Sequence, residues 1–202
     1  YLYVPNSKFN IITNFMKIIK KGTFLEDIYD IGATYKKGIF VDIFPIENAP
    51  ANPFFRRVKG FISDTLAFIG ASRYMYTYKN ETVKEYFAQN KQAYRYYKFR
   101  LFIGCLFGFF SYRTWHNIFD RFVQSNKRTG ICTIPTGRKH YFGESISANV
   151  FFPVSKGIFE NLEVNLPHDV DVYLKNLYGD YMKIPPIEKR ERHYFTKIKF
   201  EE

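Results

Sequence analysis

A long stretch without proline constrains the fold of this 202-residue chain more than any other feature. Residues 54–127 contain no proline, and their apolar side chains recur at helical spacing over 54–69, over 83–94 and from 99 to 122. Proline breaks helices, and apolar residues three or four apart share one helical face. We therefore predict several helices between residues 51 and 130.

Strand patterns lie on both sides of this region. The run Ile39 to Phe44 is short, rich in β-branched and aromatic residues, and bounded by Gly38 and Pro45, which predicts a buried strand. Residues 1–5 and 131–135 also indicate strands, 11–21 a strand or a short helix, 25–30 an acidic turn or helix start, 150–153 a strand or extended segment, and 159–167 a hairpin turning at Asn161.

One acid, Asp42, lies in the middle of the run from Ile39 to Phe44. Because side chains alternate along a strand, Asp42 shares its face with Phe40 and Phe44. An ionised carboxylate there is costly to bury unless it is paired or binds a metal. Two interpretations follow: a structural Asp at a strand edge that accepts hydrogen bonds from a turn, or a functional carboxylate.

Asp169-Val170-Asp171 is a D-x-D pair, a pattern that holds divalent metals in many transferases. Its position at the start of an apolar run ending at Gly179 favours helix capping by Asp169 instead. The tail around Lys189, Arg190 and His193 gathers cations that could hold a phosphate; the alternative is a solvated terminus.

The net charge of +11 indicates an anionic partner. Residues 54–128 contain 14 Lys and Arg against four Asp and Glu, a net charge of +10. Two interpretations stay open: basic helices on an anionic membrane surface, or a solvated basic face over an ordinary core. The apolar run 102–110 is too short to span a bilayer, so we expect a buried or an interfacial helix.

Several classes of protein have no sequence support. Two cysteines do not make a disulfide framework or a four-ligand zinc site, so a reduced, cytosolic protein is the expectation. The four histidines have no ligand spacing, and P-loop, G-x-G-x-x-G and G-x-S-x-G motifs are absent. No arginine-rich helix or zinc-finger spacing indicates nucleic acid as a partner.

Two segments together resemble the LicD family, whose members transfer phosphocholine or a related phosphoryl-linked group onto cell-surface glycans. The first is G-I-F-V-D-I-F-P at Gly38–Pro45, similar to that family's G-I-F-I-D-I-F-P segment. The second is the ending, which contains Phe152-Pro153, Phe159-Glu160, Pro167, Asp171, Tyr173-Leu174, Tyr178-Gly179-Asp180-Tyr181-Met182, Pro185-Pro186, Lys189-Arg190 and His193. The resemblance covers roughly residues 22–50 and 140–195.

The resemblance implies an α+β protein with a nucleotidyltransferase-like mixed sheet and flanking helices. Residues 1–50 would belong to this core, 51–130 would be a basic helical insertion, and 131–202 a family-specific segment packed on the core. Asp42 would be a third metal-ligating carboxylate, or the base, at a Mg²⁺ or Mn²⁺ site. Tyr178, Asp180, Arg190 and His193 would line or brace the pocket for a CDP-linked donor.

The chain also departs from the family. The upstream H-G-T-L-L-G-like segment and the D-D-D-I-D type of aspartate run are absent from these residues, so we expect a C-terminal portion that is inactive alone. The acceptor would be a lipopolysaccharide or teichoic acid glycan, lipid-linked or free, and the protein would be cytoplasmic, peripheral on the inner face of the plasma membrane. Choline phosphate, another amino-alcohol phosphate, and a polyol or sugar phosphate remain candidate groups. The alternative is a non-catalytic basic module that binds a membrane or an anionic polymer.

Overall fold

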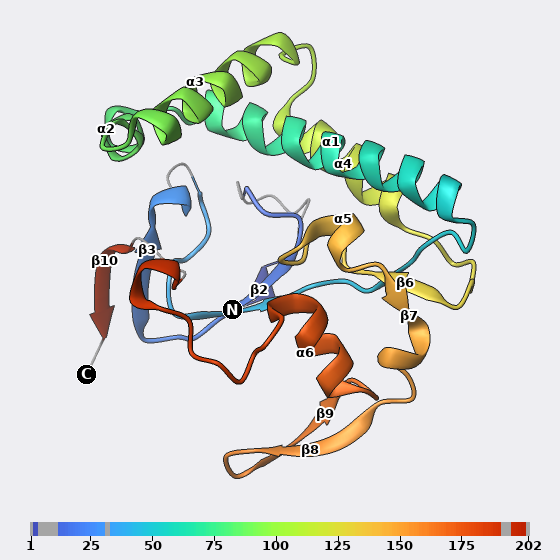
Figure 1. Cartoon of the computed structure of the whole chain (residues 1–202). Helices are drawn as coiled ribbons and strands as arrows, with labels where there is room; N and C mark the ends of the chain where they lie inside the picture. The colour runs from blue at the N-terminus through green and yellow to red at the C-terminus, as the bar shows by residue number, and fades with distance from the viewer. Residues whose placement is uncertain (1, 4–11, 31–32, 191–194, 201–202) are drawn as a thin grey trace. The chain divides into compact units, whose positions relative to one another are not determined.

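The computed structural model describes residues 2–3, 12–30, 33–190 and 195–200, which form a mixed α+β protein (Figure 1). The chain divides into two compact units. The first unit comprises residues 1–43, 65–122 and 192–202, and the second comprises 44–64 and 123–191. The unit boundaries therefore fall at other places than residues 50 and 130, where the sequence pattern changes.

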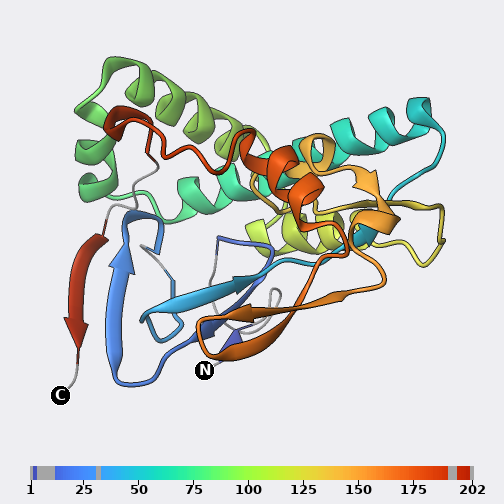
Figure 2. The same cartoon turned by 60° about the horizontal axis from the view of Figure 1, so that its bottom comes forward.

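The first unit contains two small sheets. Strands β1 (Leu2–Tyr3), β2 (Met16–Ile19) and β4 (Phe40–Ile43) form one sheet in the order β1-β2-β4. Strand β3 (Thr23–Asp27) pairs with β10 (Phe195–Phe200), and Figure 2 shows the two arrows running side by side in opposite directions. Every ladder among the described residues is antiparallel, so the expectation of a mixed sheet is wrong for this part of the chain.

The predicted strand at residues 39–44 is confirmed as β4, but it is an edge strand rather than a buried one. Val41 is 65% exposed, and Phe40, Asp42 and Ile43 are only partly buried. The sequence allowed a strand or a short helix over residues 11–21, and the structure has the strand β2 there. The acidic residues 25–30 form the end of β3 and a single 3₁₀ turn, η1 (Ile28–Asp30).

The proline-free region is helical, as predicted, and forms α1 (Pro53–Thr77), α2 (Glu81–Ala88), α3 (Lys91–Leu106) and α4 (Tyr112–Val123). Asparagines begin three of these helices, because the side chains of Asn52, Asn80 and Asn90 accept hydrogen bonds from the first free main-chain N–H groups. The apolar spacing over 83–94 indicated one helix. The structure has two, since Asn90 caps α3 and so ends α2 just before it.

Helices and the β3–η1 segment share the main core of the first unit. Ile28, Met75, Val83, Phe87 and Tyr97 form one buried cluster, in which the rings of Phe87 and Tyr97 stack at 4.9 Å. A smaller cluster joins Ile19 and Tyr35 to the partly buried Phe40. Helices α1 and α3 cross closely at Gly104, where a Cβ would overlap the main-chain carbonyl of Ser72.

The second unit contains the sheet β5 (Glu47–Asn48), β6 (Ile131–Thr133) and β7 (Ile146–Ser147), and the hairpin β8 (Ser155–Phe159) and β9 (Leu162–Leu166). Its helices are residues 53–64 of α1, α5 (His140–Gly143), α6 (Val170–Tyr178) and two 3₁₀ turns, η2 (Ala148–Val150) and η3 (Ile187–Lys189). Cys132, Ile134 and Phe151 form its core cluster.

Several predictions for this unit are confirmed. The hairpin turns at Glu160 and Asn161, and residues 131–133 are a strand. The Asp169 side chain accepts a hydrogen bond from Val172 N at 3.0 Å, and α6 ends at Gly179 with φ 72°. Residues 150–153 were expected to be a strand or an extended segment. Val150 is instead the last residue of the 3₁₀ turn η2, and residues 151–153 form a turn and bends.

Among the described residues, no helix combines the length and the hydropathy needed to cross a bilayer. The apolar run 102–110 does not form a buried helix either. Phe102, Leu106 and Phe109 are each more than half exposed. Residues 102–106 form the end of α3 and residues 107–110 lie beyond it, so the expectation of a buried helix is wrong for this run.

Candidate functional site

Asp42 lies directly opposite a lysine on the neighbouring strand. In the β2–β4 ladder Lys17 pairs with Asp42, and Lys17 Nζ is 3.2 Å from Asp42 Oδ1. The Lys17 side chain is only 8% exposed, whereas that of Asp42 is 26% exposed. Asp42 is therefore paired, as a half-buried carboxylate needs to be, and its partner is a strand lysine rather than a turn.

Aromatic rings complete the surroundings of this pair. Lys17 Nζ lies 3.5 Å from the ring centroid of Phe40 and 5.5 Å from that of Phe15, so cation–π contacts supplement the ion pair. Oδ1 of Asp42 nevertheless accepts no hydrogen bond of ordinary geometry from the described residues. The pair thus rests on charge attraction more than on directed hydrogen bonding.

A metal site is not completed by the described residues. Within residues 2–3, 12–30, 33–190 and 195–200, no three or more His, Cys, Asp or Glu side chains form a group that could hold a metal ion. Asp42 alone offers one carboxylate, beside a cation. The two further acids of such a site stay a prediction.

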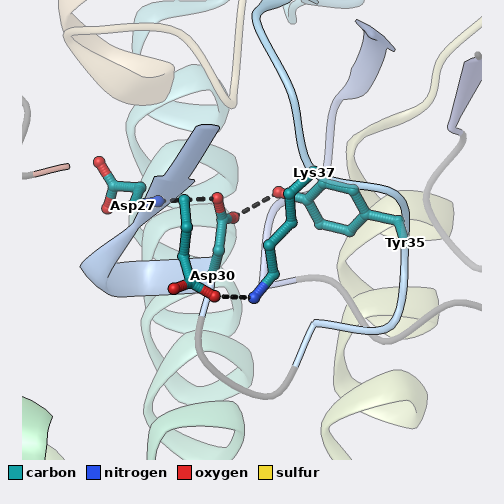
Figure 3. A network of polar contacts seen from close by, with 5 residues as sticks. Asp27, Asp30, Tyr35 and Lys37 are labelled. Carbon is teal, nitrogen blue, oxygen red and sulfur yellow. Dashed lines mark hydrogen bonds and ion pairs between the residues drawn. The ribbon is translucent and has the colours of Figure 1, made fainter. Parts of the chain in front are cut away.

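A second polar network, which the sequence indicated only as an acidic turn, lies at the end of β3 (Figure 3). The buried carboxylate of Asp30 accepts hydrogen bonds from the Tyr35 hydroxyl and from Asp27 N, the latter at 3.2 Å. Burial, followed by the charge of Asp30, raises the pKa of Tyr35. The phenol therefore stays protonated and donates to Asp30, which joins η1 to the segment before β4.

The site residues expected in the C-terminal segment are not gathered into one cluster. The Tyr178 ring lies 5.1 Å from the Arg138 guanidinium, and Arg190 Nε donates to the carbonyl of Pro185 at 2.9 Å. The Asp180 side chain is exposed, and no hydrogen bond or ion pair among the described residues joins Tyr178, Asp180 and Arg190 to one another. His193 lies outside the described residues.

The D-x-D pair serves helix α6. Asp169 caps the helix, while Asp171 forms an ion pair with Lys175 at 2.6 Å and accepts a hydrogen bond from the Tyr181 hydroxyl at 3.1 Å. The hydrogen bond from Lys175 is the main cause that lowers the pKa of Asp171. The capping interpretation is thus confirmed, and Tyr181 of the Y-G-D-Y-M segment is held by this same acid.

One buried acid escaped the sequence analysis. Glu144 is almost wholly buried, and its carboxylate accepts a hydrogen bond from Lys139 N at 2.9 Å. Burial raises its pKa, against the opposing charges of the basic residues 138–140. The carboxylate packs on Gly137, where any Cβ would overlap it. Sequence spacing offers no sign of this contact, because it depends on how closely the turn folds back.

A cavity of about 620 Å³ lies in the second unit beside β5 and β6, lined in part by Glu47, Arg128 and Cys132. The side chain of Glu47 accepts a hydrogen bond from Ser125 N at 3.2 Å. None of Tyr178, Asp180 and Arg190 lines this cavity.

Comparison with known proteins gives no relative: no family model, no curated protein and no solved structure matches the chain.

Proposed function

We propose that the chain is part of a LicD-like phosphotransferase that moves a phosphocholine-type group from a CDP-linked donor to a cell-surface glycan. One observation carries the proposal: the G-I-F-V-D-I-F-P sequence holds Asp42 on the edge strand β4, partly open to solvent, while the same chain ends in Y-G-D-Y-M and its flanking residues. The nucleotidyltransferase-like character of the fold belongs to the same proposal.

The proposed reaction is a phosphoryl-group substitution. A glycan hydroxyl oxygen attacks the phosphorus that bears choline, the bond from that phosphorus to the CMP oxygen breaks, and CMP leaves while the hydroxyl proton passes to a base. Mg²⁺ or Mn²⁺, when bound, would offset the charge on the phosphate oxygens. Asp42 would contribute one ligand to that metal or accept the proton, and Lys17 would hold its carboxylate in place.

Release of CMP tests this proposal. The full-length natural protein is incubated with CDP-choline, CDP-ethanolamine or CDP-glycerol and with a lipopolysaccharide or teichoic acid fraction. We expect one donor to yield CMP together with labelled glycan, and EDTA to abolish both products. If no donor yields CMP in the presence of Mg²⁺ or Mn²⁺, the proposed function is wrong.

A second candidate function, a basic module that binds an anionic membrane surface, is favoured by one observation in the first unit. Phe99, Phe102 and Leu106 follow one another along a single face of α3, and each is more than half exposed. Exposed Arg95 and Lys98 flank this apolar face at its start. Exposed apolar side chains bordered by cations are typical of helices that lie on anionic bilayers.

Vesicle co-sedimentation checks the membrane contact. Phe102→Ser with Leu106→Ser is expected to reduce binding to phosphatidylglycerol-containing vesicles by about tenfold, because each change removes apolar surface from the bilayer contact. The control is Ile158→Ser, which removes an even more exposed apolar side chain from β8 in the second unit. Equal binding by the α3 variant and wild type, or binding that ignores anionic lipid and salt, would exclude a role for this face.

A further inference from the structure

The part of α1 that belongs to the second unit turns its apolar side outward. Five large apolar side chains of this part are exposed, each by at least 38%: Phe54, Phe55, Val58, Phe61 and Ile62. They recur at spacings of three and four residues, so they lie along one side of the helix. We call this side the outer face of α1.

The opposite side of the same helix packs on the second unit through small and polar groups. A Cβ on Gly60 would lie 2.9 Å or less from the rings of Tyr141 and Phe142. Lys59 Nζ donates to the carbonyl of Val123 at 3.0 Å. A surface helix of a globular protein usually places its apolar side on the core and its polar side in solvent. This arrangement is reversed here, and a contiguous exposed apolar surface is typical of an interaction site.

The segments that border the outer face contain cations and no acids. Residues 49–63 contain three Arg and Lys, residues 123–130 contain two, and neither segment contains Asp or Glu. Two of these cations are already engaged. Arg56 donates to two main-chain carbonyls, and the nearby charge of Glu47 partly offsets that of Lys59.

The other three cations are available to a partner. Arg57, Lys127 and Arg128 are exposed, and their side chains form no ion pair or hydrogen bond within the part of the chain that the structure describes. Arg57 lies three residues after Phe54 and four before Phe61, so its side chain borders the outer face along the helix.

A cavity joins the remaining two cations to the outer face. It has a volume of about 520 Å³ and lies between the start of α1 and the loop that leads into β6. Phe55, Lys127 and Arg128 are among its lining residues, which include no Asp or Glu. An anionic group in this cavity would therefore be held beside the apolar side chains of α1.

We propose that the outer face of α1 lies in the headgroup region of an anionic bilayer, with the phosphate of one lipid headgroup in the cavity beside Lys127 and Arg128. Only a bilayer offers an apolar interior directly beneath an anionic surface. A second copy of the chain, paired symmetrically over this face, would bring like charges together. The inference requires neither the phosphotransfer reaction nor the contact of α3, because it rests on other residues in the second unit.

Co-sedimentation with vesicles of phosphatidylcholine and phosphatidylglycerol tests the apolar contact. We expect Phe54→Ser with Phe61→Ser to weaken binding by at least about tenfold, because two apolar side chains are lost from the bilayer. The control, Phe159→Ser with Leu162→Ser, removes two similarly exposed side chains from the β8–β9 hairpin of the same unit. Its binding should stay within about twofold of wild type. Equal loss in both variants, or no binding by wild type, would overturn the inference.

The same assay at low salt tests the headgroup contact. Lys127→Gln with Arg128→Gln should weaken binding to these vesicles by about tenfold, and less at high salt, since two cations near the lipid phosphates are lost. The control, Lys20→Gln with Lys183→Gln, removes the same charge from two exposed lysines that do not line the cavity. If both variants bind equally, the cavity does not hold a headgroup.

A tryptophan on the outer face locates the contact. In Phe61→Trp, lipids with brominated acyl chains should quench the added fluorescence, whereas the buried Trp115 of wild type should keep its intensity. If the variant binds vesicles but its added fluorescence is not quenched, another surface makes the contact and the inference is wrong. It is equally wrong if sedimentation shows a wild-type dimer that Phe54→Ser with Phe61→Ser converts into a monomer, because the outer face then binds a second copy.

Discussion

Asp42→Asn is expected to lower the free energy of unfolding by about 2 kcal/mol. The change leaves the Lys17 ammonium, 8% exposed, without its counter-charge. Removing one member of a buried pair typically costs 3–5 kcal/mol. We expect less, because the Asp42 carboxylate is a quarter exposed and the Phe40 ring keeps its contact with the ammonium. Denaturant titration, with hydrogen exchange of the β2 and β4 amides, measures the loss.

The matched control for this variant removes both charges. In Lys17→Met with Asp42→Asn no unpaired charge remains buried, so most of the lost stability should return. A double-mutant cycle over the four proteins then isolates the coupling between the two side chains. If the two changes lower the free energy of unfolding additively, with no recovery in the double variant, Lys17 is not the main partner of Asp42.

Acid is expected to destabilise the first unit through His116. This side chain is 4% exposed, against Gly70 and the ring of Tyr112, and burial lowers its pKa from 6.5 to about 4. Below pH 6.5 the unfolded chain binds a proton at this residue that the folded chain does not bind. The contribution of neutral His116 to the free energy of unfolding is therefore complete above pH 6.5. It is lost as the pH falls towards 4, by about 1.4 kcal/mol per pH unit and about 3 kcal/mol in total.

Fluorescence of Trp115, the only tryptophan and the neighbour of His116, reports this unfolding. His116→Gln should flatten the dependence of the unfolding free energy on pH between 6.5 and 4. His168→Gln, which changes an exposed histidine of the second unit, should retain it. The explanation fails if the wild-type and His116→Gln slopes coincide in this range.

Local patterns in the sequence predicted much of the secondary structure. The absence of proline and the 3.6-residue periodicity predicted the helices within 53–123, and Asp169 and Gly179 marked the ends of α6 correctly. These signals lie within a few residues of the structure that they determine. The break at Asn90 was missed, because an asparagine cap competes with an apolar periodicity that continues across it.

Contacts between distant segments could not be predicted in this way. The pairing of Lys17 with Asp42 depends on strand register, which links residues 25 positions apart. The contact between the Glu144 carboxylate and Gly137, and the packing of Gly38 on Ile19 and Thr23, depend on close approaches that no local pattern indicates. The C-terminal residues Tyr178, Asp180 and Arg190 were proposed from a resemblance, and their role stays a prediction.

The rate of CMP release by the Lys17→Met, Asp42→Asn double variant tests the central claim most directly. In this variant the ion pair is gone without leaving a buried charge, so folding is separated from chemistry. If Asp42 acts in phosphotransfer, the double variant of the full-length natural protein should fold like wild type yet transfer at least about 100-fold more slowly, a loss of roughly 3 kcal/mol of transition-state stabilisation. Transfer within a few-fold of wild type would mean that Asp42 only balances Lys17.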